Sequence, residues 1–180
     1  MTTPALLAAG VSGDLLGEAC AGCHGTNGLS LSPMPRIAGI NKDYLVKTMK
    51  NYQAGERTST IMERLAKGYT EEEFAAIGEF FGGKTWEVPA QKVDAKLVAQ
   101  GEKLHKEKGC EACHKENGKF TDAKTPRIAG QWSRYLEIVM EEYGDPDRKM
   151  PDQMMKTMFK MSKFSADDLK AFAHFYASQK

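Results

Sequence analysis

All four cysteines of this 180-residue chain lie in two copies of one short motif. The copies, "CAGCH" and "CEACH", begin 90 residues apart and contain Cys20, Cys23, Cys110 and Cys113. In a C-x-x-C-H motif the two thiols can bond to the vinyl groups of one haem, and the histidine that follows can bind the haem iron. The motifs therefore predict two covalently attached haem c groups, with His24 and His114 as iron ligands.

A C-x-x-C pair also occurs in zinc sites and in redox disulfides. Two such pairs could bind one zinc ion, but zinc-ribbon pairs usually lie much closer in sequence, and both histidines would have no role. A thioredoxin-like redox motif needs a βαβ context, and strand patterns are nearly absent from this chain. Haem attachment is the favoured interpretation because it gives every one of these residues a role.

The two halves of the chain repeat one unit of about 90 residues. "PRIAG" occurs at residues 35–39 and again at 126–130, and "YTEEEFAAIGEFF" at 69–81 resembles "FSADDLKAFAHFY" at 164–176. The halves meet near "GGKTWEVPAQKVD" at residues 82–94, where two glycines and Pro89 oppose a continuous helix. We therefore predict two domains, residues 1–88 and 89–180.

The repeated unit has the pattern of an all-α protein. Thr70 and Ser165 are natural N-caps, and each is followed three residues later by an acidic residue, as in a capping box. Apolar residues at helical spacing come after both caps. Gly101 lies in a further helical segment, where it would allow another helix to approach closely. Because a unit this small buries little surface, we expect the haem to form much of each core.

The composition limits the possible partners. No apolar run reaches the ~18 residues that indicate a membrane span. The formal net charge of +1 does not favour nucleic acid. Residues 1–88 carry a net charge of −2 and residues 89–180 a net charge of +3, a difference too small to identify a partner. The N-terminal stretch lacks a basic region and is not a complete signal peptide.

These features together resemble the class I dihaem cytochromes c of the cytochrome c4 type. A narrower resemblance is to the dihaem cytochrome subunit of flavocytochrome c sulfide dehydrogenase. The stretches that carry it are "CAGCHGTNG", "STIMERLAKGY", "QGEKLHKEKGCEACH", "AGQWSRYL" and "FYASQ", which extend over nearly the whole chain. The resemblance implies two tandem class I cytochrome c domains, each wrapped around one covalent haem c.

The resemblance also implies a function and a location. It implies a bacterial periplasmic protein whose leader has been removed, because haem c is attached outside the cytoplasm. It implies a heterodimer with an FAD-containing sulfide dehydrogenase subunit, with electrons passing from flavin to the haems and on to a soluble acceptor. In this view the chain carries electrons and has no catalytic residues of its own.

Two other functions fit the same sequence. The chain could be a free cytochrome c4-like carrier that delivers electrons to a terminal oxidase. It could also be a haem enzyme or gas sensor with one open iron position. Filled axial positions on both irons favour an electron carrier, because the ligands then change little between ferric and ferrous states.

A methionine thioether is the expected second axial ligand, since it is a soft donor that suits ferrous iron. In the first half, Met34 lies in a proline-flanked loop and Met49 in a helical pattern. Met62 precedes the last helix of its half by the distance that the family uses. We therefore predict that Met62 binds the first haem iron.

The second half offers several methionines within "RKMPDQMMKTMFKM", residues 148–161. Aligning Thr70 with Ser165 places Thr157 opposite Met62, so this half must contain an insertion between ligand and helix. Counting from the repeated arginines leads instead to Met154 and Met155. The family resemblance favours Met154, with Met155 as second choice and Met150 as third.

The resemblance also implies supporting contacts. Pro35 and Pro126 would offer backbone carbonyls to the ligating imidazoles. Arg36 and Arg127 would pair with haem propionates, although a solvated surface position is nearly as compatible with the sequence.

Overall fold

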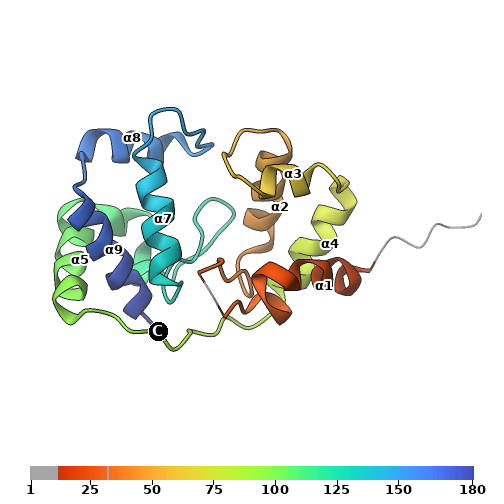
Figure 1. Ribbon diagram of the computed structural model, residues 1–180, viewed down its shortest axis with the longest axis horizontal. Coiled ribbons are helices and arrows are strands. Elements are labelled where there is room, and N and C mark those ends of the chain that lie inside the picture. Colours follow the sequence, from red (N-terminus) through yellow and green to blue (C-terminus); the bar gives the residue numbers. More distant parts are fainter. Residues whose placement is uncertain (1–11, 32) are drawn as a thin grey trace, which may run out of the picture.

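The computed structural model describes residues 12–31 and 33–180 and contains helices but no strand in that part of the chain. The first half holds α1 (Gly13–His24), α2 (Lys42–Gln53), α3 (Met62–Ala66) and α4 (Glu71–Gly82). The second half holds α5 (Ala95–Glu107), α6 (Lys115–Gly118), α7 (Ser133–Tyr143), α8 (Gln153–Ser162) and α9 (Ala166–Ser178). Figure 1 shows these two sets as separate lobes joined by an extended segment. The predicted all-α class is confirmed.

The last helix of each half begins where the sequence predicts. Thr70 caps α4 and Ser165 caps α9, and both form a complete capping box, with Glu73 and Asp168 respectively. Asp94 caps α5 by accepting hydrogen bonds from the N–H groups of Lys96 and Leu97. These side chains satisfy helix N–H groups that would otherwise lack partners.

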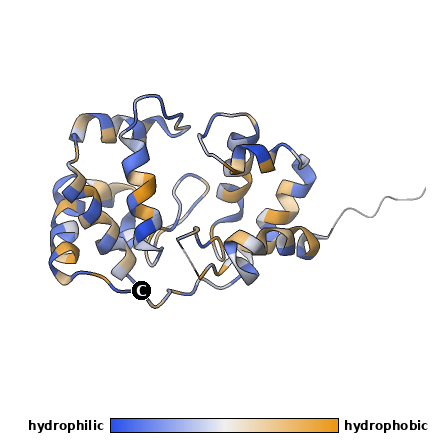
Figure 2. Ribbon diagram, in the orientation of Figure 1, coloured by the Kyte–Doolittle hydropathy of each residue, from blue (hydrophilic) through white to orange (hydrophobic). Residues whose placement is uncertain are grey.

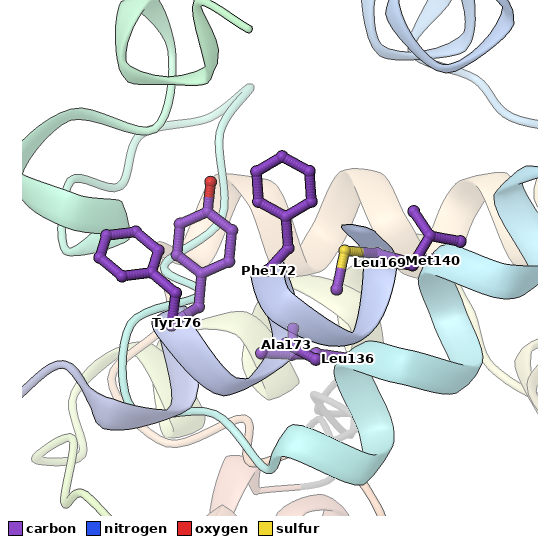
Figure 3. Close-up of a cluster of buried hydrophobic side chains, with 7 residues drawn as sticks. Leu136, Met140, Leu169, Phe172, Ala173 and Tyr176 are labelled. Carbon is purple, nitrogen blue, oxygen red and sulfur yellow. The ribbon is translucent and has the colours of Figure 1, made fainter. Parts of the chain in front are cut away.

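Each half has its own hydrophobic core. In the first half the core joins α1, α2 and α4 and contains Leu16, Ile40, Leu45, Ile77 and Phe81. In the second half α9 packs against α7 and α5, with Leu136, Met140, Leu169, Phe172, Ala173, Phe175 and Tyr176 at the centre (Figure 3). Figure 2 shows hydrophobic and hydrophilic residues following one another along individual helices, as expected when each helix buries one face. The division at residue 88 falls in the extended segment between the two cores.

Close helix packing in the second half depends on Gly101, as the sequence suggests. A Cβ at this position would lie 2.2 Å from the carbonyl oxygen of Ala171, so α5 and α9 touch backbone to backbone. In the first half Gly17 has a similar role, because a Cβ there would lie 2.2 Å from the ring of Phe80. The sequence patterns did not identify Gly17.

The two PRIAG segments form the junction between the halves. The backbone N–H of Arg36 donates to Gln131 Oε1 at 3.0 Å, and Gln131 Nε2 donates back to the carbonyl of Arg36 at 3.0 Å. Trp132 Nε1 donates to the carbonyl of Ser30 at 3.2 Å. Trp86 contacts the glycine turns of both segments, at Gly39 and Gly130. A paired set of backbone and side-chain contacts therefore fixes one half on the other.

Within the described residues no helix is both long enough and apolar enough to cross a membrane.

Candidate haem sites

The first C-x-x-C-H motif forms the end of α1. Cys20 is partly buried against the first core, Cys23 is exposed, and His24 is the last residue of the helix. Burial raises the pKa of the Cys20 thiol, and the nearby Cys23 adds to the increase. The helical turn therefore presents two thiols and one imidazole from five consecutive residues.

The His24 imidazole is held by one hydrogen bond. Its Nδ1 lies 2.8 Å from the carbonyl oxygen of Pro35, so Nδ1 carries the proton and donates, and Nε2 is available to a metal. Burial lowers the pKa of His24, and the bond to Pro35 opposes that decrease. The contact predicted for Pro35 is confirmed.

The second motif has a different local structure. Helix α5 ends at Glu107, and Cys110–Ala112 form a separate 3-10 turn after Gly109, whose φ is +69°. His114 then precedes α6, in which Glu116 and Asn117 have positive φ. The second set of thiols and imidazole thus lies on a turn instead of the end of a long helix.

The contact predicted between Pro126 and His114 is wrong for this structure. His114 Nδ1 is buried and has no hydrogen-bond partner among the described residues. The spacing supplies a reason: Pro35 follows His24 by 11 residues, whereas Pro126 follows His114 by 12. Burial, with a smaller effect of the nearby His105, lowers the pKa of His114 to about 4, and Asp152 partly opposes this decrease. The imidazole is therefore neutral at neutral pH, as an iron ligand must be.

The other histidines already have partners. His105 is 1% exposed, and its Nδ1 lies 3.0 Å from the hydroxyl of Tyr176. His174 Nδ1 accepts a hydrogen bond from the backbone of Asp94 at 3.0 Å, and its Nε2 lies 3.7 Å from Glu137 Oε1. Both histidines form contacts between helices of the second half.

Met62 lies at the first position of α3. Its N–H donates to Ser59 Oγ at 3.1 Å, and the N–H of Ser59 donates to Glu63 Oε1 at 2.8 Å. This pair of bonds fixes the turn that carries Met62, and the methionine itself is partly buried. Sequence reasoning missed Ser59, although a serine three residues before the ligand is a recognisable capping signal.

The methionines of the second half lie on and before α8. Asp152 caps this helix by accepting from the N–H of Met155 at 2.9 Å. Met154 is 68% exposed, Met155 is partly buried and Met150 is 7% exposed. The Asp152 carboxylate, at the start of α8, is near enough to His114 to oppose the decrease in the pKa of that imidazole. Met154 and Met155 are both on this turn, whereas Met161 is at the far end of the helix.

The structure does not bring the cysteines together as a zinc site requires. In residues 12–31 and 33–180, no three side chains of His, Cys, Asp or Glu gather where they could hold one metal ion. Four thiols converging on one zinc would form such a group. Two separate sites, each with one histidine, are what this arrangement can provide.

Comparison with known proteins identifies the kind of site. Residues 98–180 match the family model for cytochrome c. The structure superimposes on reduced recombinant cytochrome c4 from Pseudomonas stutzeri with a TM-score of 0.82, covering 93% of this chain and 97% of that one at 25% identity. Residues 98–180 are therefore a cytochrome c domain, and the chain as a whole is similar to dihaem cytochromes c. Its fold is that of two tandem class I cytochrome c domains, as the resemblance implied.

Two relatives match different shares of this chain. The cytochrome subunit of sulfide dehydrogenase from Chlorobaculum tepidum is 49% identical over 70 residues, 39% of this chain. The match covers 64% of the length of that subunit. The thiosulfate dehydrogenase electron acceptor of Stutzerimonas stutzeri is 29% identical over 171 residues, covering 89% of this chain and 78% of the relative.

The similarity to cytochromes c supports covalently bound haem c, and the residues present fit that cofactor. The first site has two thiols on one turn and a neutral imidazole with its Nε2 free, oriented by Pro35. The second has the same donors and a neutral imidazole but lacks the orienting bond. The two sites therefore have the same donor groups, two thiols and one imidazole, but the residues around these groups differ.

Ser59 and Asp152 accept hydrogen bonds from the N–H groups of Met62 and Met155, which allows a matched prediction about the turns that carry the methionines. We expect Ser59→Ala and Asp152→Ala each to cost about 1 kcal/mol of unfolding free energy, because each leaves helix N–H groups without an acceptor. Ser59→Thr and Asp152→Asn keep the acceptor and should cost less. Denaturant unfolding of the haem-loaded protein measures this, and an alanine variant as stable as its conservative partner would contradict it.

Proposed function

We propose that the chain carries one haem c in each half and is the electron-transfer subunit of a flavin-dependent sulfide dehydrogenase. Electron transfer as such is what its relatives share. The finer assignment rests on one observation, the 49% identity over 70 residues with the cytochrome subunit from Chlorobaculum tepidum. In this proposal the donor is an FAD-containing partner subunit, the acceptor is a soluble protein, and the location is the bacterial periplasm.

Each residue of the sites has a defined task in this proposal. The thiols of Cys20 and Cys23 hold one haem by thioether bonds, and those of Cys110 and Cys113 hold the other. His24 and His114 bind the irons through Nε2, since neutral imidazoles need no deprotonation at neutral pH. When bound, each haem iron accepts and donates one electron. The protein holds the haem in place and limits its contact with water.

We further propose that methionines complete the axial ligation, Met62 in the first half and Met154 in the second. Support for Met62 is its fixed place in the turn between Ser59 and Glu63. Support for Met154 is its place on the first turn of α8, near His114, together with the family resemblance. Met155 is the alternative, because it is on the same turn and less exposed.

The two candidates can be separated by replacing each methionine alone. We expect Met154→Ala to abolish the six-coordinate low-spin state of the second haem, because no thioether then reaches the iron. We expect Met155→Ala to leave both haems low-spin. Absorption and magnetic circular dichroism spectra of the purified haem-loaded protein measure the spin state. If the second haem stays low-spin in the Met154 variant and loses the low-spin state in the Met155 variant, Met155 is the ligand instead of Met154.

The alternative function is a free dihaem carrier of the cytochrome c4 type. It is favoured by the structural match, which covers nearly the whole of both chains, whereas the sulfide dehydrogenase relative matches only part. A free carrier needs no tightly bound flavoprotein.

Isolation of the native protein distinguishes the two functions. We expect it to co-purify with an FAD protein, and sulfide to reduce its haems only when that protein is present. The control is the purified cytochrome alone with sulfide. Native cytochrome isolated without flavin, and unreduced by sulfide in the cell extract, would favour the free carrier.

A further inference from the structure

One peptide group connects the second half of the chain to the first haem site. The carbonyl oxygen of Pro35 accepts a hydrogen bond from His24 Nδ1 at 2.8 Å, and the N–H of the next residue, Arg36, donates to Gln131 Oε1 at 3.0 Å. This carbonyl and this N–H belong to the same planar peptide group. The Gln131 side chain is therefore linked to the imidazole of the other half through a single peptide group.

The carboxamide of Gln131 is held firmly in place beside this peptide group. Gln131 is 3% exposed, and its Nε2 donates to the carbonyl of Arg36 at 3.0 Å. Its Oε1 also accepts from the backbone N–H of Trp132 at 3.1 Å. The backbone carbonyl of Gln131 accepts from Gln91 Nε2 at 2.9 Å. These contacts keep the acceptor oxygen on the N–H of Arg36.

Hydrogen bonds at the two ends of a peptide group strengthen each other. An acceptor on the N–H increases the negative charge on the carbonyl oxygen, because electron density shifts through the partial double bond. Arg36 and Gln131 are both buried, so water screens this effect little. A more negative Pro35 oxygen is a better acceptor for His24 Nδ1. An imidazole with a stronger hydrogen bond at Nδ1 is in turn a stronger donor to iron.

The second haem site has no equivalent connection among the described residues. The repeat of "PRIAG" places Ile40 at the position of Gln131, and Ile40 is buried in the core of the first half. Its side chain has no hydrogen-bonding group. The Nδ1 of His114 also has no hydrogen-bond partner in the described part of the chain. The connection therefore leads only from the second half to the imidazole of the first.

We propose that Gln131 is a positioning residue for the first haem site. It acts on His24 through the peptide group between Pro35 and Arg36, strengthens the hydrogen bond of the imidazole, and thereby lowers the reduction potential of the haem bound there. The second half thus helps to set the potential of the first. The statement about potential rests on the part of the proposed function that places a haem on His24, and it does not depend on which protein supplies the electrons.

Gln131→Met in the haem-loaded protein is the direct test, because methionine is of similar length but offers the Arg36 N–H only a weak acceptor. We expect the His24 Nδ1–H proton signal in NMR spectra of the reduced protein to move upfield, since its hydrogen bond becomes weaker. We expect the redox equilibrium of the first haem to shift about threefold towards the reduced state, about 28 mV for a one-electron couple. The His114 signals and the low-spin spectra of both haems should stay unchanged.

Trp132→Phe is the matched control, because it changes the same junction without changing the peptide group. It removes the hydrogen bond from Trp132 Nε1 to the carbonyl of Ser30, which also joins the two halves. It keeps the backbone N–H that donates to Gln131 Oε1. We expect the His24 signal and the potential of the first haem to stay as in the natural protein. Changes as large as those in Gln131→Met would overturn the proposal, because a loosened junction alone would then explain them.

If Gln131→Met does not fold, Gln131→Glu replaces it. Its carboxylate accepts from the Arg36 N–H more strongly than an amide oxygen does, so the His24 signal should move downfield and the equilibrium should shift towards the oxidised state. An unchanged His24 signal in the folded variant would overturn the proposal. Failure of sulfide to reduce the natural protein, with the His24 signal altered as expected in the variant, would overturn only the proposed function.

Discussion

The hydrogen bond between His24 and the carbonyl of Pro35 connects the haem site with the rest of the fold. It orients the imidazole at the end of α1 and joins it to the PRIAG turn. The next residue of that turn, Arg36, exchanges two hydrogen bonds with Gln131 of the other half. The N–H of Gly39, at the end of the turn, donates to the carbonyl of Phe81 in α4 at 2.8 Å. One short segment therefore links the ligand, the neighbouring domain and the last helix of its own half.

The second repeat has the same arrangement, except that the hydrogen bond from the histidine to the proline carbonyl is absent. Gly130 donates to the carbonyl of Tyr176 at 2.8 Å, as Gly39 does to Phe81, but His114 lacks the bond to the proline carbonyl. A buried His105–Tyr176 pair occurs beside this imidazole, whereas the first half has Phe81 at the position of Tyr176. Hydrogen bonds to the ligating imidazole and the polarity of the pocket both influence a haem's reduction potential. The duplicated halves thus provide two chemically different environments for the same donor set.

The sequence predicted those features that local patterns determine. The C-x-x-C-H motifs, the repeat and the capping boxes at Thr70 and Ser165 follow from patterns in the sequence, whereas the bond to Pro35 was implied by the family resemblance. The hydrogen bonds between Arg36 and Gln131 could not be predicted in this way, because they depend on how two folded halves meet. In the described residues His114 Nδ1 has no hydrogen-bond partner, because one extra residue separates His114 from Pro126. The sequence shows this extra residue, but its effect becomes evident only when the two turns are compared. The assignments of Met62 and Met154 stay predictions.

The proposal of one covalent haem in each half is tested by the intact mass of the native chain. We expect the mass to exceed that of the polypeptide by two haem groups. With Cys110 and Cys113 both replaced by alanine, the excess should fall to one, and the remaining haem should map to the peptide that contains Cys20 and Cys23. A native chain that carries a single haem, or none, would contradict the account.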